Sequence, residues 1–246
     1  MLRLYYFPGT CAFAPQVLLE EIAKPYELEI VVPASKLSGS PDLASSADWR
    51  RINPKGRVPA LLGVDGSSGS TPELLTEVSA ILYYLGRTNP ELGLIPESAA
   101  AQARCIEWMN YLASNLHAVA LAQVSRGARF VTGEDLFPNV AARGRANALD
   151  GFAYVETVLE DGREWAVPGG FSIVDPYLTM FFDAGEKLFP DMAERHPAWA
   201  RLATKNHQRP AMQRVVEREA VALAEAREGR FHSRRTYYAE GTAAVS

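Results

Sequence analysis

Near the N-terminus the chain reads Tyr5-Tyr6-Phe7-Pro8-Gly9-Thr10-Cys11-Ala12-Phe13-Ala14-Pro15. The prolines and the glycine end a strand, and Pro15 suits the first turn of a helix, where its missing N–H removes no hydrogen bond. Cys11 is therefore expected among the unpaired N–H groups at the start of that helix. These groups and the positive end of the helix dipole favour a thiolate, either that of Cys11 or that of a ligand. The alternative is a small buried core cysteine.

The spacing of apolar residues around this turn predicts alternating strands and helices. The predicted elements, in chain order, are a strand at 2–6, a helix at 14–22, a strand at 26–32, a short helix at 44–51, strands at 58–64 and 74–75, and a helix at 77–87. The order β-α-β followed by β-β-α indicates a small mixed sheet with helices on its faces.

After residue 89 the pattern becomes helical almost throughout. Helices are predicted at about 101–123, 139–159, 173–186, 196–206 and 211–227. The segment Phe171-Ser172-Ile173-Val174-Asp175 is typical of a capping box, in which Asp175 reaches back to Ser172. The predicted organisation is a first domain at 1–87, a linker at 88–98, an all-helical domain at 99–230 and a flexible tail at 231–246.

Composition limits the classes of function. The chain has 246 residues, of which 48% are hydrophobic, and a formal net charge of −4, which is typical of a soluble globular protein and does not favour nucleic acid as a partner. Two cysteines, Cys11 and Cys105, indicate a reducing, cytoplasmic location. Cys105 is expected to be a buried apolar residue. The sequence shows neither a signal peptide nor an apolar run long enough for a membrane.

Further motifs follow the first turn in order. They are Asn53-Pro54-Lys55-Gly56-Arg57-Val58-Pro59-Ala60-Leu61, then Leu75-Thr76-Glu77 before a helix, then the capping box. Together they resemble a cytosolic glutathione S-transferase over about residues 1–220. Cys11, in place of a serine or tyrosine, and the helical segment 106–117 resemble the bacterial beta class. The resemblance implies an α+β fold, with a thioredoxin-like N-terminal domain followed by an all-α C-terminal domain, and glutathione as co-substrate.

The resemblance also implies a glutathione site in the first domain. If Pro59 is cis, as in the family, the backbone N–H and C=O of Val58 are open to an extended peptide. Without the resemblance, a Val-Pro step reads as the start of a strand. Glu77 would meet the γ-glutamyl ammonium of the ligand, or else only cap its helix. Val78 stands where the family often has a hydroxyl residue and leaves only a main-chain N–H. Lys36 would reach the ligand's glycine carboxylate, or else lie solvated in a loop.

The second domain is expected to contribute Asn110 and His117. These residues are seven apart and therefore share one face of an α-helix. In the resembled class both positions face the bound sulfur and peptide, and a neutral His117 would help to deprotonate the thiol. The alternative for His117 is a structural role. The spacing of the histidines and cysteines does not suggest a metal site, so no metal is predicted.

Three functions remain open at this stage. The first is a glutathione transferase that attacks small hydrophobic electrophiles, a detoxification chemistry, with Cys11 and His117 as catalytic residues and an apolar acceptor pocket near Phe13, Tyr111, Ser114 and residues 126–137. The second is a glutathione-dependent monothiol oxidoreductase that uses Cys11, since Cys11-Ala12-Phe13-Ala14 lacks a second cysteine. The third is a non-catalytic protein that binds glutathione or a partner protein. A homodimer is expected from the resemblance alone.

Overall fold

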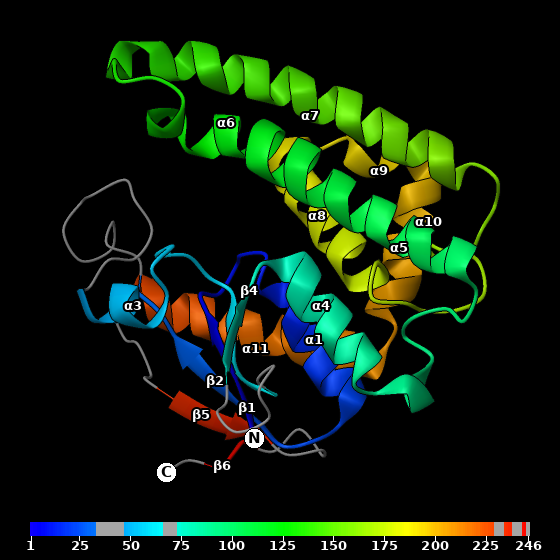
Figure 1. Ribbon diagram of the computed structural model, residues 1–246. Coiled ribbons are helices and arrows are strands. Elements are labelled where there is room, and N and C mark those ends of the chain that lie inside the picture. The colour runs from blue at the N-terminus through cyan, green and yellow to red at the C-terminus, as the bar shows by residue number, and fades with distance from the viewer. Residues whose placement is uncertain (33–46, 66–72, 229–233, 238–242, 245–246) are drawn as a thin grey trace. The chain divides into compact units, whose positions relative to one another are not determined.

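The structure is a computed structural model that describes residues 1–32, 47–65, 73–228, 234–237 and 243–244. The chain forms two units. Unit 1 combines Met1–Leu92 with Gln208–Ser246, and unit 2 comprises Gly93–His207. Each unit has its own layers of secondary structure, which Figure 1 shows coloured along the chain.

Unit 1 is built on one mixed sheet. Its strands are β1 (Leu2–Tyr6), β2 (Tyr26–Ile30), β3 (Ala60–Val64), β4 (Glu73–Thr76), β5 (Arg234–Tyr237) and β6 (Ala243–Ala244). They lie in the order β4-β3-β1-β2-β5-β6. Strands β1 and β2 are parallel, whereas β3 runs antiparallel to both β1 and β4. This sheet and its helices confirm the predicted thioredoxin-like arrangement.

The helices of unit 1 are α1 (Phe13–Ile22), α3 (Ala47–Ile52), α4 (Val78–Arg87), the short 3-10 helix η1 (Pro90–Leu92) and α11 (Pro210–Arg227). Helix α1 packs against α4 and against α11 (Figure 1). These two neighbours explain why even polar residues of α1, such as Gln16 and Glu20, are buried.

The position of α11 differs from the predicted domain boundaries, because this helix belongs to unit 1. The Glu20 carboxylate on α1 accepts hydrogen bonds from Arg214 Nε at 2.6 Å, from Arg218 and from the Tyr26 hydroxyl. Burial alone would raise the pKa of Glu20, but these hydrogen bonds outweigh it and lower the pKa. Glu21 also accepts two hydrogen bonds from Arg209. Ion pairs therefore fasten α11 to α1.

The predicted flexible tail is also wrong for residues 234–237, which form β5 antiparallel to β2. Tyr237 is buried and stacks on Tyr26, with ring centroids 5.5 Å apart. The Arg218 guanidinium lies 4.2 Å from the centre of the Tyr237 ring. A cation over an aromatic face is attracted by the ring's quadrupole. These ring contacts hold β5 in a defined place beside β2.

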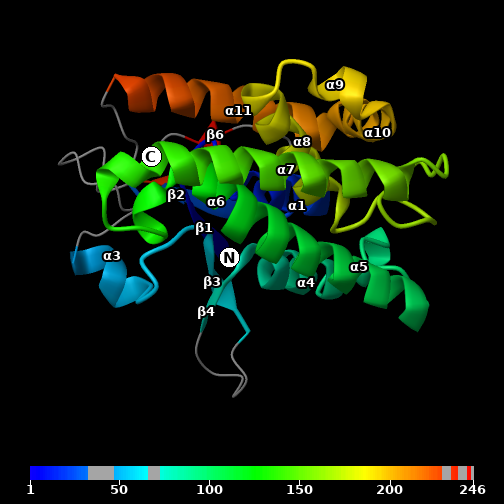
Figure 2. The same cartoon turned by 90° about the horizontal axis from the view of Figure 1, so that it is seen from above.

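Unit 2 is helical, as predicted. Its elements are α5 (Ala99–Tyr111), the π-helical segment η2 (Leu112–Leu121), α6 (Ala122–Ser125), the 3-10 turns η3 (Gly127–Arg129) and η4 (Glu134–Leu136), α7 (Phe137–Leu159), α8 (Asp175–Leu188), α9 (Met192–Arg195) and α10 (Pro197–His207). Segments η2 and α6 run alongside α7 (Figures 1 and 2). Gly144 permits this approach, because a Cβ there would lie 2.8 Å from the carbonyl oxygen of Ala120.

Asp175, at the start of α8, has a carboxylate that is fully buried. It accepts hydrogen bonds of 2.8 Å from the N–H of Ala166, the N–H of Ser172 and the hydroxyl of Ser172. The predicted return of Asp175 to Ser172 is therefore confirmed. Burial raises the pKa of Asp175 to about 6, although each of these hydrogen bonds acts in the opposite direction.

Among the described residues, no helix combines the length and the apolar character that crossing a membrane requires.

Replacing Asp175 with alanine is expected to destabilise unit 2. The Asp175→Ala variant leaves buried N–H and O–H donors without an acceptor, which costs about 3 kcal/mol of unfolding free energy. Urea denaturation followed by circular dichroism measures the loss. Asp150→Ala, at an exposed position in α7, is the control and should change stability by less than about 0.5 kcal/mol. Equal urea midpoints for the two variants would contradict the role of Asp175.

The same carboxylate predicts a dependence of stability on pH. Its pKa of about 6 in the folded protein lies above the ordinary value of 3.8, so ionisation is disfavoured by folding. This penalty is absent below the lower value and complete above the higher one, and it amounts to about 3 kcal/mol. Relative to the non-titrating Asp175→Asn variant, the wild type should therefore lose about that much stability between about pH 4 and pH 7. A difference that stays constant over this range, in urea titrations, would refute the prediction.

Candidate functional site

The sheet topology brings three segments of unit 1 to one end of the sheet. In the antiparallel pairs, Tyr5 of β1 lies opposite Ala60 of β3, and Ala60 lies opposite Thr76 of β4. The end of β1, the start of β3 and the end of β4 are therefore neighbours. The residues that follow or precede these positions include Cys11, the Val58-Pro59 step and Glu77. The sequence motifs thus converge because of strand direction.

The turn between β1 and α1 holds Cys11 just before the helix. The Thr10 hydroxyl donates to the carbonyl oxygen of Phe7 at 2.7 Å and accepts from the N–H of Ala12 at 3.3 Å. Cys11 is only 7% exposed, and its Sγ lies 4.0 Å from the carbonyl oxygen of Val58, within reach of a weak S–H hydrogen bond. The predicted position at the start of α1 is confirmed. Cys11 is also largely buried. Its environment therefore combines the two interpretations of the sequence, a thiol at the start of a helix and a small buried cysteine.

The Val58-Pro59 peptide bond is cis, as the resemblance implies. The turn before it is organised by Asn53, which is buried. The Asn53 side chain donates to the carbonyl oxygen of Arg57 at 2.7 Å and accepts from the N–H of Lys55 at 3.1 Å. Val58 itself packs on the cluster formed by Tyr5, Trp49 and Ala60. The backbone beside Cys11 is therefore fixed both by hydrogen bonds and by apolar contacts.

Glu77 adopts φ +73° and ψ 126° immediately before α4. This conformation costs a non-glycine residue about 1–3 kcal/mol, and such strain tends to occur at functional sites. The Glu77 carboxylate lies 2.6 Å from the ammonium of Lys55, which also donates to the Thr76 hydroxyl at 2.8 Å. Both side chains of this ion pair are more than half exposed, so a ligand can reach them. Val78 is buried and begins α4.

Three predicted site residues belong to other parts of the chain. Lys36 is outside the described residues. Asn110 and His117 belong to unit 2, where Asn110 is exposed and His117 packs edge-on against Phe181, with ring centroids 6.0 Å apart. The π-helical segment η2 begins between them. A π-helix has i→i+5 hydrogen bonds, so the α-helical spacing that predicts a shared face does not apply.

Cys105, the other cysteine, is fully buried in α5. Burial raises its pKa to about 11, so this thiol stays protonated near neutral pH. It behaves as the buried apolar residue that the sequence predicts. Within the part of the chain that the structure describes, no three His, Cys, Asp or Glu side chains form a group suited to a metal ion.

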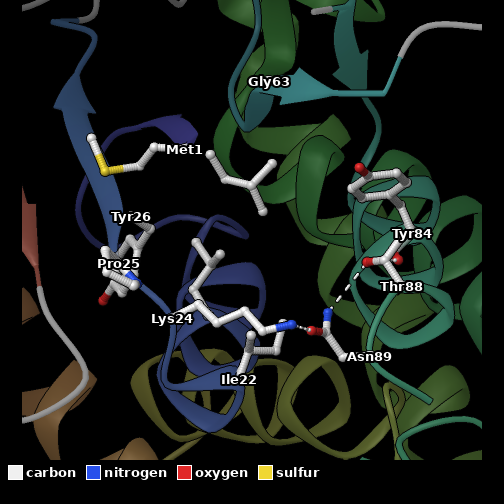
Figure 3. A pocket seen from close by; sticks show the side chains of 11 residues that line it. Met1, Ile22, Lys24, Pro25, Tyr26, Gly63, Tyr84, Thr88 and Asn89 are labelled. Carbon is white, nitrogen blue, oxygen red and sulfur yellow. Dashed lines mark hydrogen bonds between the residues drawn. The ribbon is translucent and has the colours of Figure 1, made fainter. Parts of the chain in front are cut away.

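Each unit also contains a cavity. In unit 2 a cavity of about 490 Å³ is lined by two of the predicted pocket residues, Tyr111 and Ser114, together with polar residues such as Asn147 and Asp150. In unit 1 a cavity of about 330 Å³ lies among Met1, Leu2, Leu19, Ile22, Lys24, Pro25, Tyr26, Gly63, Tyr84, Thr88 and Asn89. There the Lys24 ammonium donates to the Asn89 side chain at 2.6 Å (Figure 3). None of the predicted site residues lines the cavity of unit 1.

Sequence reasoning missed Lys55 and Asn53 as members of the site. Their segment, Asn53-Pro54-Lys55-Gly56, carries a clear turn signal of Asn, Pro and Gly. That signal predicts a turn, but it does not reveal that Lys55 reaches Glu77 across the end of the sheet.

Replacing Asn53 with alanine is expected to loosen the turn that precedes the cis peptide bond. Because the carbonyl oxygen of Arg57 and the N–H of Lys55 lose their partner, Asn53→Ala should lower the unfolding free energy by about 1–3 kcal/mol. Urea denaturation of this variant and of Asn139→Ala, which removes an exposed amide in α7, tests the difference. Two variants that are equally stable would show that Asn53 does not organise the turn.

The chain is similar in sequence to known proteins. Residues 1–87 match the family model of the glutathione S-transferase N-terminal domain. Over 229 residues the chain is 32% identical to glutathione S-transferase GstA of Escherichia coli O157:H7, an alignment that covers 93% of this chain and 99% of that relative.

Solved structures show the same similarity. A glutathione transferase homologue from Sulfitobacter with bound glutathione superposes with a TM-score of 0.75 at 30% identity, covering 89% of this chain and 98% of that one. A beta class glutathione S-transferase from Sphingomonas chungbukensis gives a TM-score of 0.68 at 25% identity, covering 89% and 99% of the two chains. The protein therefore belongs to the glutathione S-transferase family.

Proposed function

We propose that the protein binds glutathione along the Val58-Pro59 step, with the glutathione sulfur beside Cys11. The observation that carries this proposal is the 4.0 Å approach of Cys11 Sγ to the Val58 carbonyl oxygen at the cis peptide bond. As a glutathione S-transferase the protein uses glutathione as co-substrate, and the glutathione-bound Sulfitobacter relative supports the same use here. An extended peptide can pair with the backbone N–H and C=O of a single residue such as Val58, in the manner of an added strand.

The polar ends of glutathione match the surroundings of this step. Glu77 would receive the γ-glutamyl ammonium in place of its present partner, Lys55. The N–H of Val78, at the first position of α4, would bind the neighbouring α-carboxylate, because backbone N–H groups at a helix N-terminus favour anions. Lys36 remains a predicted ligand of the glycine carboxylate. Asn110 and His117 remain predicted contributions from unit 2.

The reaction that follows is nucleophilic attack by the bound sulfur, in the form of a substitution. The thiol of glutathione loses its proton, and the sulfur forms a bond to an electrophilic carbon while a leaving group such as chloride departs with the electrons of the broken bond. Lowering the thiol pKa by about two units favours the thiolate by about 2.7 kcal/mol, and one or two hydrogen bonds to sulfur suffice. Cys11 would donate one such bond, and His117 would act as the base.

Finer assignments belong to the same proposal. The electrophile is small and hydrophobic, and conjugation serves detoxification. The protein is a cytoplasmic homodimer of the beta class, and the assignment to that class is supported by Cys11 and by the similarity to the Sphingomonas structure.

A second function, a monothiol oxidoreductase, is favoured by the placement of Cys11 at the start of α1. In that reaction the Cys11 thiolate attacks a mixed disulfide of glutathione, releases the other thiol, and is regenerated by a second glutathione, which leaves as oxidised glutathione.

A Cys11→Ala variant distinguishes these two reactions. If the attacking sulfur belongs to glutathione, conjugation of an activated aromatic chloride should fall by no more than about tenfold, which corresponds to one lost hydrogen bond of about 1.4 kcal/mol. Release of glutathione from a mixed disulfide should stop. Cys105→Ala is the matched control and should leave both activities unchanged, because that thiol is buried and protonated. Complete loss of conjugation in Cys11→Ala would place the attacking sulfur on the protein instead.

A further inference from the structure

We propose that Glu219 on α11 is a positioning residue for the turn that carries Cys11, an inference that rests on the proposed glutathione site. Glu219 is buried in unit 1. One oxygen of its carboxylate accepts a hydrogen bond from the side-chain amide of Gln16 at 2.6 Å, and the other accepts from the backbone N–H of Gly9. The two donors lie on either side of Cys11 in the sequence.

Gly9 is the point at which α11 meets this turn. Its φ of +73° favours glycine, and a Cβ built at Gly9 would lie 3.3 Å from the side chain of Leu223. Leu223 and Glu219 are four residues apart and therefore share one face of α11. On that face Leu223 lies next to Gly9, and Glu219 accepts a hydrogen bond from the Gly9 N–H. In Figure 1 α11 runs beside α1, as this double contact requires.

Further hydrogen bonds hold the residues on both sides of Cys11. Gly9 is followed by Thr10, whose hydroxyl joins the carbonyl oxygen of Phe7 to the N–H of Ala12. Gln16 lies one turn further into α1 and is fully buried. Glu219 thus holds the turn on one side of Cys11 and the helix on the other. Hydrogen bonds to an ionised carboxylate are stronger than those between neutral groups, and a low local dielectric strengthens them further.

Through these contacts Glu219 keeps the Cys11 sulfur in its position beside Val58. Without Glu219, the N–H of Gly9 and the amide of Gln16 lose their acceptor, and the turn is free to shift relative to the cis peptide bond. Glutathione should then bind less tightly, because the groups that meet its sulfur and its backbone are no longer held in register. Glu219 itself touches neither glutathione nor the reacting atoms in this proposal.

The test compares Glu219→Ala with Glu217→Ala, which removes an exposed carboxylate from the same helix. Glutathione binding is measured by calorimetry, and the KM for glutathione and kcat are measured in the conjugation assay. Glu219→Ala should raise the glutathione KM about tenfold, equivalent to about 1.4 kcal/mol, with a smaller change in kcat. Glu217→Ala should match the wild type.

A double variant that exchanges the two side chains, Gln16→Glu with Glu219→Gln, keeps the test decisive if Glu219→Ala folds poorly. Glu219→Gln alone offers an acceptor to only one of the two donors. Combined with Gln16→Glu, it restores both contacts, because residue 219 then accepts from Gly9 and donates to the new carboxylate. The double variant should recover a KM within about threefold of the wild type. Protection of the Gly9 amide from hydrogen exchange should fall in Glu219→Ala and stay near the wild-type level in the double variant, in which residue 219 keeps an acceptor for the Gly9 N–H.

Three results would overturn the inference. One is a folded Glu219→Ala variant with an unchanged glutathione KM, and another is a folded double variant with no recovery. In both cases the wild type still binds glutathione, so only the role of Glu219 fails. The third is a wild type that takes up no glutathione in the calorimeter, which rejects the proposed site together with the inference.

Discussion

The antiparallel pairing of β3 with both β1 and β4 is the constraint on which the candidate site depends. Because strand direction reverses across each pair, the end of β1, the start of β3 and the end of β4 meet at the same end of the sheet. Cys11, Val58 and Glu77 are far apart in the chain, yet each stands next to one of these strand ends. The site is thus a product of topology, and the local turns only refine it.

Two buried carboxylates of unit 1 then hold the helices in place beside this end of the sheet. Glu20 binds two arginines of α11, and Glu219 of α11 accepts a hydrogen bond from Gly9 in the turn before α1. A buried carboxylate is costly unless it is hydrogen bonded, so each favours one docking of the two helices over alternatives. The C-terminal helix therefore belongs physically to the N-terminal sheet, and the stacked Tyr237 extends this attachment into β5.

Much of this was readable from the sequence, because the signals were local. Alternation predicted β1 and β2, and helical spacing predicted α1 and α4. The cis bond at Pro59 was expected only from the family resemblance, because the Val-Pro step alone reads as the start of a strand. The failures have separate causes. The docking of α11 and β5 rests on pairs such as Glu20 with Arg218, whose members are distant in sequence and carry no local signature. The π-helical segment also escaped, because apolar spacing alone does not distinguish it from an α-helix. Lys36 lies outside the described residues, and its role rests on resemblance.

A crystal structure of the protein with S-methylglutathione tests the central claim most directly, because the methylated sulfur cannot form a disulfide with Cys11. The account predicts that the cysteinyl backbone of the ligand forms hydrogen bonds of about 2.9 Å with the N–H and C=O of Val58. It also predicts that the sulfur lies at the start of α1 and that the ammonium reaches Glu77. A ligand bound instead in the cavity beside Lys24 and Asn89, or one that makes no backbone hydrogen bond to Val58, would contradict it.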